Sequence, residues 1–358
     1  MFVQIVAPPG SAHAEPADCL RSFVFDANLA AQEASGDPAA SGSPRRVLQR
    51  LQGSAESVTY LFGLTTTAMG TAGELGLPVI SAAEPSPEID FDGFIHISLP
   101  LLEETDNADI ECVLAADLLP LPGEELEPEA LDVTRALARE ALRLTRQLGR
   151  KNAQVGMLYP PDADHTYDPM SQAYLELGFR QKHAERQMYV DIQPTAPVLG
   201  AQVWPDYDIP KELLDDVLRL LTIASADAVY GDLSVEPIVW TRQRLNEAYA
   251  RLRSRKAHTL LVGILERGRV VALTELSRHG DADPEVCEWT LTVTDRAYRR
   301  RGLATRAKQH AQYAVTHHWP TVRRAYCSVA QADPAMNALY ARLGAHIISA
   351  SSAYELTV

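Results

Sequence analysis

The stretch Arg299-Arg300-Arg301-Gly302-Leu303-Ala304-Thr305 decides the fold of the second half of the chain. It follows an alternating apolar strand expected over residues 286–294, and a helical run follows it. A glycine turn that opens a helix leaves free backbone N–H groups. With the helix dipole and three arginines, these groups form an anion site suited to a pyrophosphate. The scarcity of glycine argues against a dinucleotide-binding turn, and the missing Gly-Lys-Ser/Thr argues against a Walker-type loop.

Composition predicts an ordinary globular protein of about two domains, since the chain has 358 residues with 46% hydrophobic and 22% charged residues. No apolar run approaches the ~20 residues that a membrane span needs. The net charge of −14 argues against a nucleic-acid or anionic-membrane partner. Four scattered cysteines without CxxC spacing predict neither disulfides nor a metal site, and they favour a cytoplasmic location.

The charge is unevenly distributed along the chain. No lysine or arginine occurs between Arg50 and Arg135, whereas acidic residues recur there. Two interpretations stay open: a solvated acidic face, or an electrostatic funnel for a cationic acceptor.

The second half predicts a regular alternation of strands and helices. A hairpin is indicated by Arg267-Gly268, which joins two apolar runs. The expected elements are a strand at 199–204, helices at 211–226 and 241–253, strands at 258–266, 269–277 and 286–294, a helix to 319, a strand at 322–329, a helix at 334–343, and a last pair of short strands to 356.

This order and two motifs resemble the GNAT superfamily of N-acyltransferases. The arginine-rich turn fits the pattern Arg/Gln-x-x-Gly-x-Gly/Ala of the coenzyme A loop in that superfamily. The helix Pro334–Leu343, closed by Gly344, is similar to the Asn-x-x-Ala/Met-x-x-Leu-Tyr helix at the same place in the family. The resemblance implies an α/β fold with a mixed, mostly antiparallel sheet flanked by helices.

A repeat indicates that the first half is a second copy of the same fold. Met170, Tyr174 and Leu177-Gly178 align without a gap on Met336, Tyr340 and Leu343-Gly344. The upstream order agrees, with a strand at 109–116, a helix at 131–148 and a strand at 153–158. We therefore expect two tandem GNAT folds, over residues 1–196 and 197–358. Such two-copy chains resemble mycothiol synthase and related actinobacterial acyltransferases.

The two copies differ at the anion turn. The first copy carries prolines and glutamates over residues 118–129, where the second carries arginines. Proline removes N–H donors and carboxylates repel a pyrophosphate, so we expect no coenzyme A binding in the first copy.

The resemblance implies how the second copy holds acetyl-coenzyme A or another acyl-coenzyme A. The backbone of Thr292, Val293 and Thr294 would pair with pantetheine, and the amides of residues 300–305 would hold the pyrophosphate. Asn337 would contact the cofactor, with a helix-start hydrogen bond as its alternative role.

Catalytic roles follow from the same resemblance. Glu288 is expected on the face of its strand that also carries Thr290 and Thr292, buried enough to act as general base. Glu275 is the second candidate base or an acceptor ligand. Tyr340 is the expected acid toward the departing thiolate, with a packed aromatic as its alternative role.

The predicted activity is direct transfer of an acetyl or other short acyl group to a primary amine of a small molecule or peptide. The loop at 227–232, with Tyr230 and Asp232, is expected to contact the amine. A homodimer is left open. The alternatives are a non-catalytic protein that senses acyl-coenzyme A, and an acyltransferase whose donor is bound to a carrier protein.

Overall fold

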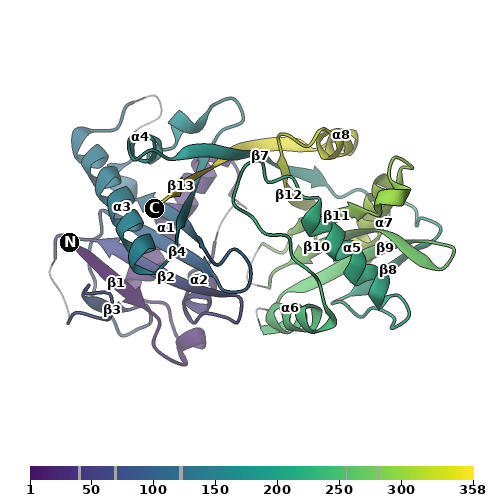
Figure 1. Cartoon of the computed structure of the whole chain (residues 1–358), viewed down its shortest axis with the longest axis horizontal. Helices are drawn as coiled ribbons and strands as arrows, with labels where there is room; N and C mark the ends of the chain where they lie inside the picture. Colours follow the sequence, from purple (N-terminus) through teal and green to yellow (C-terminus); the bar gives the residue numbers. More distant parts are fainter. Residues whose placement is uncertain (39–41, 68–70, 121–123, 255, 281–282) are drawn as a thin grey trace. The chain divides into compact units, whose positions relative to one another are not determined.

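The computed structural model describes residues 1–38, 42–67, 71–120, 124–254, 256–280 and 283–358, and it divides into two compact units (Figure 1). Unit 1 comprises residues 1–185, 230–236 and 348–358, and unit 2 comprises residues 186–229 and 237–347. Unit 1 therefore takes residues from both halves of the sequence, whereas unit 2 lies entirely within the second half. The boundary expected at residues 196/197 stays a prediction.

Unit 1 contains a sheet with the strand order β3-β1-β2-β4-β5-β6-β13. Its neighbours are antiparallel except for the parallel pairs β1–β3 and β5–β6. The strands are β1 (Phe2–Val6), β2 (Ser57–Leu64), β3 (Val79–Ser81), β4 (Gly93–Pro100), β5 (Asn107–Leu114), β6 (Asn152–Tyr159) and β13 (His346–Thr357). The helices are α1 (Asp18–Ser35), α2 (Pro44–Leu51), α3 (Pro128–Gln147) and α4 (Ser171–Glu176), with short 3₁₀ turns at Ser11–His13, Ala116–Leu118 and His165–Tyr167.

Helices cover both faces of this sheet, because the inward residues of each strand alternate between two cores. Leu137 and Ala141 of α3 pack with Ile95, Ile97 and other strand residues on one face. On the other face, Phe23 of α1 packs in a core that α2 also joins. The element order agrees with the copy expected from the repeat.

Unit 2 contains the strand order β12-β11-β10-β9-β8, and β7 lies next to β12. The strands are β7 (Arg180–Asp191, shared between the units), β8 (Ala201–Pro205), β9 (His258–Glu266), β10 (Arg269–Arg278), β11 (Val286–Thr294) and β12 (Arg324–Ala330). The helices are α5 (Leu214–Ala226), α6 (Arg242–Ser254), α7 (Leu303–His318) and α8 (Pro334–Arg342), with a 3₁₀ turn at Arg296–Tyr298.

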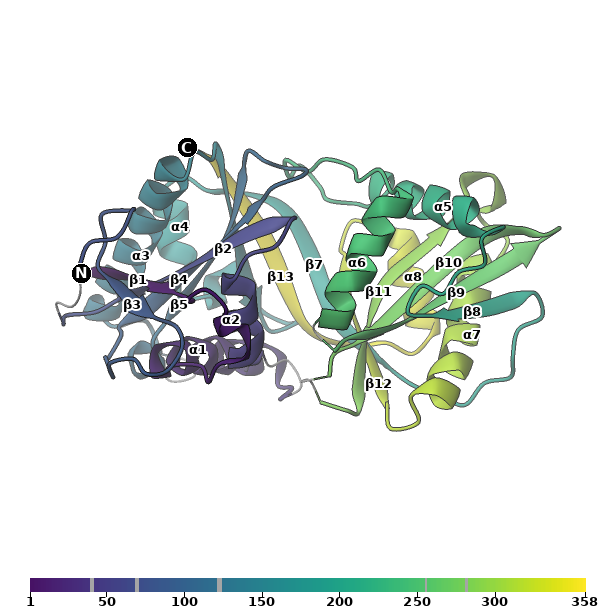
Figure 2. The same ribbon diagram turned by 90° about the horizontal axis from the view of Figure 1, so that it is seen from below.

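The helices of unit 2 also pack on two opposite faces (Figure 2). Leucines of α5 and Leu245 of α6 meet Leu273 and Val293 in one core. Ala311 and Val315 of α7 meet Trp289 and Tyr340 in the other. Side chains alternate along β10 and β11 between the face of the sheet that α5 covers and the face that α7 covers. We call these the α5 side and the α7 side, and candidate site residues lie on both.

The prediction for the end of the chain was wrong. A single long strand, β13, replaces the expected pair of short strands, and it runs antiparallel to β6 from Ala350↔Tyr159 to Thr357↔Asn152. The C-terminal strand therefore completes the sheet of unit 1. Among the described residues, no helix is both long and apolar enough to cross a membrane.

Candidate active site

The arginine-rich turn forms the strand-to-helix turn that the sequence predicts. Gly302, with a φ of 72°, is the N-cap of α7, and Arg300 also adopts a left-handed backbone with a φ of 62°. No side chain caps the helix, and the first helical hydrogen bond runs from the Arg306 N–H to the Gly302 carbonyl. The amides of the first turn are therefore available to an anion.

The arginines of this turn have different environments. Arg299 forms an ion pair with Asp227 and donates to the Thr294 carbonyl at 3.2 Å. Arg301 lies 5.0 Å from the centroid of the Tyr298 ring. Among the residues that the structure describes, the Arg300 guanidinium has no hydrogen-bond or ion-pair partner. Arg300 is thus the cation best placed to meet an incoming phosphate.

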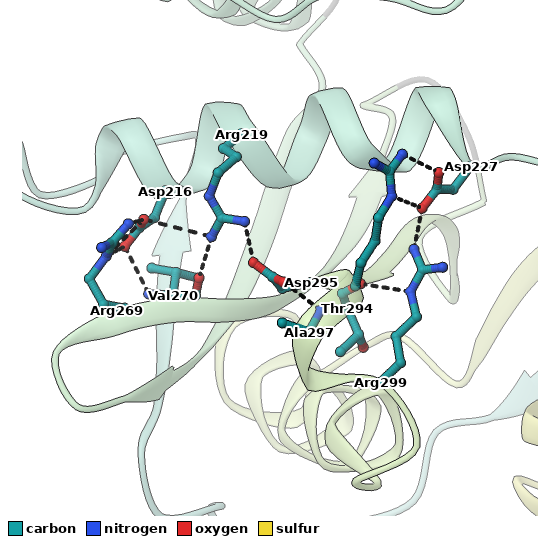
Figure 3. Close-up of polar contacts among 10 residues, drawn as sticks. Asp216, Arg219, Asp227, Arg269, Val270, Thr294, Asp295, Ala297 and Arg299 are labelled. Atoms are coloured by element: carbon teal, nitrogen blue, oxygen red, sulfur yellow. Dashed lines mark hydrogen bonds and ion pairs between the residues drawn. The ribbon is translucent and has the colours of Figure 1, made fainter.

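Helix α5 fixes the turn through a series of carboxylate–guanidinium contacts (Figure 3). Asp216 is buried and accepts from Arg269 Nε at 2.7 Å. Arg219 pairs with Asp295, which caps the 3₁₀ turn by accepting from the Ala297 N–H. The first half of α5 is therefore tied to β10 and to the segment that follows β11.

Asp227 ends this series of contacts. It accepts from Arg296 Nη2 at 2.6 Å and also pairs with Arg299. The Arg296 hydrogen bond, followed by that of Arg299, lowers the pKa of the Asp227 carboxyl to about 2 against the opposing effect of burial. The sequence analysis placed Asp227 in an acceptor loop, but its carboxylate is engaged by the arginine-rich turn.

The edge of β11 next to β12 is paired along part of its length. The parallel β11–β12 ladder joins Val286–Glu288 to Arg324–Tyr326. Beyond it, Thr292, Val293 and Thr294 pair on their other edge with β10. Within the described parts of the chain, no strand pairs with the β12-side edge at these three residues. Apart from the Thr294 carbonyl, which accepts from Arg299, the backbone groups on this edge are therefore available to an extended ligand.

A β-bulge changes which residues of β11 share a face. The register against β10 shifts between Glu275 and Leu276, and Thr290 is the extra residue. Thr292 therefore lies on the α7 side, where its hydroxyl is 2.9 Å from Thr274 Oγ1, the acceptor of the Trp289 indole N–H. The expectation that Glu288, Thr290 and Thr292 share one face was wrong, because strict alternation does not account for a bulge.

The bulge assembles a polar cluster around Glu275. Thr290 Oγ1 donates to Glu275 Oε1 at 2.7 Å, and the Tyr207 hydroxyl donates to Oε2 at 2.8 Å. Burial raises the pKa of the Glu275 carboxyl, although both hydroxyl bonds favour its ionised form. The carboxylate is therefore held in a fixed orientation in a partly desolvated position.

Glu288 has a more exposed environment than expected. Its side chain is 52% exposed, and its Oε2 lies 4.0 Å from His279 Nε2. It stands where β11 is still paired with β12, opposite Tyr326. The burial expected for this candidate base is wrong, because about half of its side chain is exposed.

Tyr340 and Asn337, both on α8, are hydrogen-bonded to other residues of unit 2. Tyr340 is buried, its hydroxyl accepts from Lys308 Nζ at 2.7 Å, and burial raises its pKa well above the usual value. The Asn337 amide donates to the Ala330 and Asp333 carbonyls and accepts from Arg186 at 3.0 Å. The helix-start hydrogen bonds weighed for Asn337 are present, and they occupy its amide.

Lys308 was missed in the sequence analysis. It lies on α7 with no exposed surface, in the core that contains Trp289 and Tyr340. Burial lowers the pKa of its ammonium group to about 7. Helical spacing could have indicated this burial. Lys308 lies three residues before Ala311 and seven before Val315, and therefore on the apolar face of the helix.

The acceptor-loop candidates Tyr230 and Asp232 belong to unit 1, whereas Glu275 belongs to unit 2. The Asp232 N–H donates to the Lys182 carbonyl. Nearby, Glu355 of β13 accepts from the backbone N–H and the hydroxyl of Ser234 at 3.0 and 2.9 Å. Segment 230–236 is thus anchored on strands of unit 1.

The first copy has a tyrosine at the position that matches Tyr340. Tyr174 is buried in the α3 core, and burial raises its pKa well above the usual value. At the matching turn, residues 116–118 form a 3₁₀ turn and α3 starts at Pro128, while residues 121–123 lie outside the described residues. A buried tyrosine at this position therefore also occurs where no arginine-rich turn exists.

Comparisons with known proteins agree with this fold. Residues 226–345 match the family model described as the acetyltransferase (GNAT) family. A tandem GNAT protein from the clavulanic acid biosynthesis pathway, solved without AcCoA, superposes with a TM-score of 0.67 at 16% identity, covering 100% of this chain and 98% of that one. A GCN5-related N-acetyltransferase from Sphaerobacter thermophilus superposes with a TM-score of 0.59 at 14% identity, covering 99% and 95%. A search among curated proteins finds no match. The likenesses establish a tandem arrangement of this fold.

Proposed function

We propose that the chain transfers an acetyl or other short acyl group from acyl-coenzyme A to a primary amine, because residues 226–345 match the acetyltransferase (GNAT) family. The observation that carries the proposal is the uncapped N-terminus of α7, with Gly302 in a left-handed conformation and Arg300 beside it. The described residues fit the donor, because free amides, a nearby cation and the unpaired β11 edge match its pyrophosphate and pantetheine parts.

Acyl-coenzyme A supplies a thioester, and residues of unit 2 handle the protons. A primary amine is mostly protonated at neutral pH, so a base must accept a proton before or during attack. We assign this role to Glu275 in preference to Glu288. Its support is the fixed orientation given by Thr290 and Tyr207, together with partial burial.

Tyr340 is the proposed donor of a proton to the departing sulfur. Its raised pKa keeps the phenol protonated throughout the neutral range, as an acid requires. Attack would take place directly between amine and thioester. The contacts proposed for Tyr230 and Asp232 with the acceptor stay predictions, as does an acyl donor bound to a carrier protein.

A screen of defined primary amines tests the activity. The full chain is mixed with acetyl-coenzyme A and each amine, and release of free thiol is followed, with calorimetry of acetyl-coenzyme A binding in parallel. Amine-dependent thiol release supports the proposal. Tight binding without turnover on any amine favours the sensing alternative, and absence of binding overturns the proposal.

A further inference from the structure

Lys308 is a lysine enclosed in the core of unit 2. Its Nζ lies 2.7 Å from the Tyr340 hydroxyl oxygen, 3.8 Å from the centroid of the Trp289 ring and 4.1 Å from that of Tyr340. These rings come from β11 and α8, so three elements converge on one ammonium group. No surface of Lys308 reaches solvent.

This lysine is unusual because no carboxylate compensates its charge. Among the residues that the structure describes, Lys308 forms no ion pair, and the titratable groups around it are Tyr340 and Cys327. Aromatic faces and one hydrogen bond offset only part of the cost of burying an ammonium group. A methionine would fill similar space without that cost, which points to a role for the amino group itself.

The contact with Tyr340 has a defined direction. Lys308 Nζ donates to the phenol oxygen, which leaves the phenol O–H for another acceptor, and Cys327 is a neighbouring titratable group. A donated N–H hydrogen bond stabilises the phenolate more than the phenol, most strongly when Lys308 is protonated, so it makes the hydroxyl a stronger acid. Rotation about the C–O bond can redirect the hydroxyl hydrogen while the Lys308 contact is kept.

We propose that Lys308 is a positioning residue that acts through Tyr340, orienting its phenol and increasing its acidity toward the sulfur of coenzyme A. The inference rests on the proposed function. As the acyl C–S bond breaks, its electron pair stays on sulfur, and the Tyr340 O–H proton moves to that sulfur. Lys308 keeps its N–H hydrogen bond to the phenol oxygen and so stabilises the phenolate, which then takes a proton from water.

The test uses coenzyme A itself, so no amine acceptor is needed. The ultraviolet absorbance of the thiolate is titrated against pH for coenzyme A bound to the full chain. Because the Lys308–Tyr340 pair offers the sulfur a stronger hydrogen bond, the wild type should lower the pKa of the bound thiol. Lys308→Met should reverse this shift by about one pKa unit, a tenfold change in the acid dissociation constant.

The role through Tyr340 is tested in a double-mutant cycle. Tyr340→Phe should abolish the shift, and adding Lys308→Met to Tyr340→Phe should change nothing further. If the methionine variant folds poorly, the thiol pKa is measured instead in Lys308→Gln, which keeps an N–H donor but lacks the charge. Lys211→Met, at an exposed lysine, is the matched control and should titrate as the wild type.

Two results would overturn the inference while leaving the proposed function intact. One is an unchanged thiol pKa in Lys308→Met with normal coenzyme A binding. The other is an effect of Lys308→Met that persists in the Tyr340→Phe background. Failure of the wild type to bind coenzyme A overturns the proposed function instead. The role proposed for Lys308 is then also wrong, because it depends on that function.

Discussion

Asp227 and Arg296 are joined by two hydrogen bonds, at 2.6 and 3.0 Å, and the same carboxylate also pairs with Arg299. This contact ties the C-terminal end of α5 to the segment that leads into the anion turn. Asp227 thus holds the side chains of Arg296 and Arg299 in place before any ligand binds.

Asp227→Asn should destabilise the protein by about 1 kcal/mol at pH 6, because charge-assisted bonds to two arginines are weakened at a partly exposed site. Since folding lowers the pKa of Asp227 to about 2, its contribution is complete above the pKa of the unfolded chain and is lost as pH falls toward 2. Urea unfolding at pH 6 and pH 3 measures the difference, which should shrink at the lower pH. Asp215→Asn is the control, since that carboxylate is 83% exposed and pairs with Arg242 alone; an equal effect of both variants contradicts the prediction.

Gly302→Ala should cost about 1 kcal/mol of stability, because a Cβ is strained at a φ of 72°. Gly268→Ala, at a φ of 77° in the β9–β10 hairpin, should cost a similar amount, and a Cβ meets no atom within 4 Å at either position. Only Gly302→Ala should weaken coenzyme A binding, by about tenfold, since its methyl group would narrow the approach to the α7 amides. Calorimetry measures the affinity of both variants for coenzyme A. Equal affinities would mean that the turn at Gly302 does not belong to the binding site.

Glu275→Gln should lower kcat by about 10²–10³-fold, as expected for the loss of a general base. Glu288→Gln should stay within a few-fold of the wild type, because its side chain is half exposed. The pKa of Glu275 is raised, so kcat/KM of the wild type should fall as pH drops through that raised pKa, and the glutamine variant should lose this acid limb. The reverse ranking of the two variants would return the base role to Glu288.

Lys308→Met should stabilise the protein at pH 7 by about 1–3 kcal/mol, because a buried ammonium is removed. Folding lowers the pKa of Lys308 to about 7, so the unfolded chain binds more protons above that pH, and the wild type gains stability as pH rises. Its deficit relative to the variant should therefore narrow between pH 7 and 9, by up to about 1.4 kcal/mol per unit. Urea unfolding at pH 7, 8 and 9 tests this, and a constant gap would mean that Lys308 does not titrate there.

Local patterns in the sequence predicted the arginine-rich turn and the tandem fold. The turn at Arg299–Thr305 could be predicted because a glycine before an amphipathic run determines both the turn and the helix start. The repeat around Tyr174 and Tyr340 indicated the tandem fold for the same reason. Both features lie within short windows of the chain.

Features that depend on long-range pairing could not be predicted. The bulge at Thr290 arises from the register of β11 against β10, which alternation within one strand does not encode. The exposure of Glu288 depends on tertiary packing around that end of β11, which the residues of the strand alone do not specify. The pairing of β13 with β6 joins residues about two hundred positions apart, and no local pattern specifies such a partner.

The place of β13 in unit 1 has a consequence for biosynthesis. A ribosome that adds about 5–20 residues per second releases β6 many seconds before β13 exists. During that interval, one edge of β6 lacks its final neighbour, and Glu355 is not yet present to hold Ser234. The nascent N-terminal region must therefore wait with an open sheet edge, a state in which chaperones or other nascent chains can engage it.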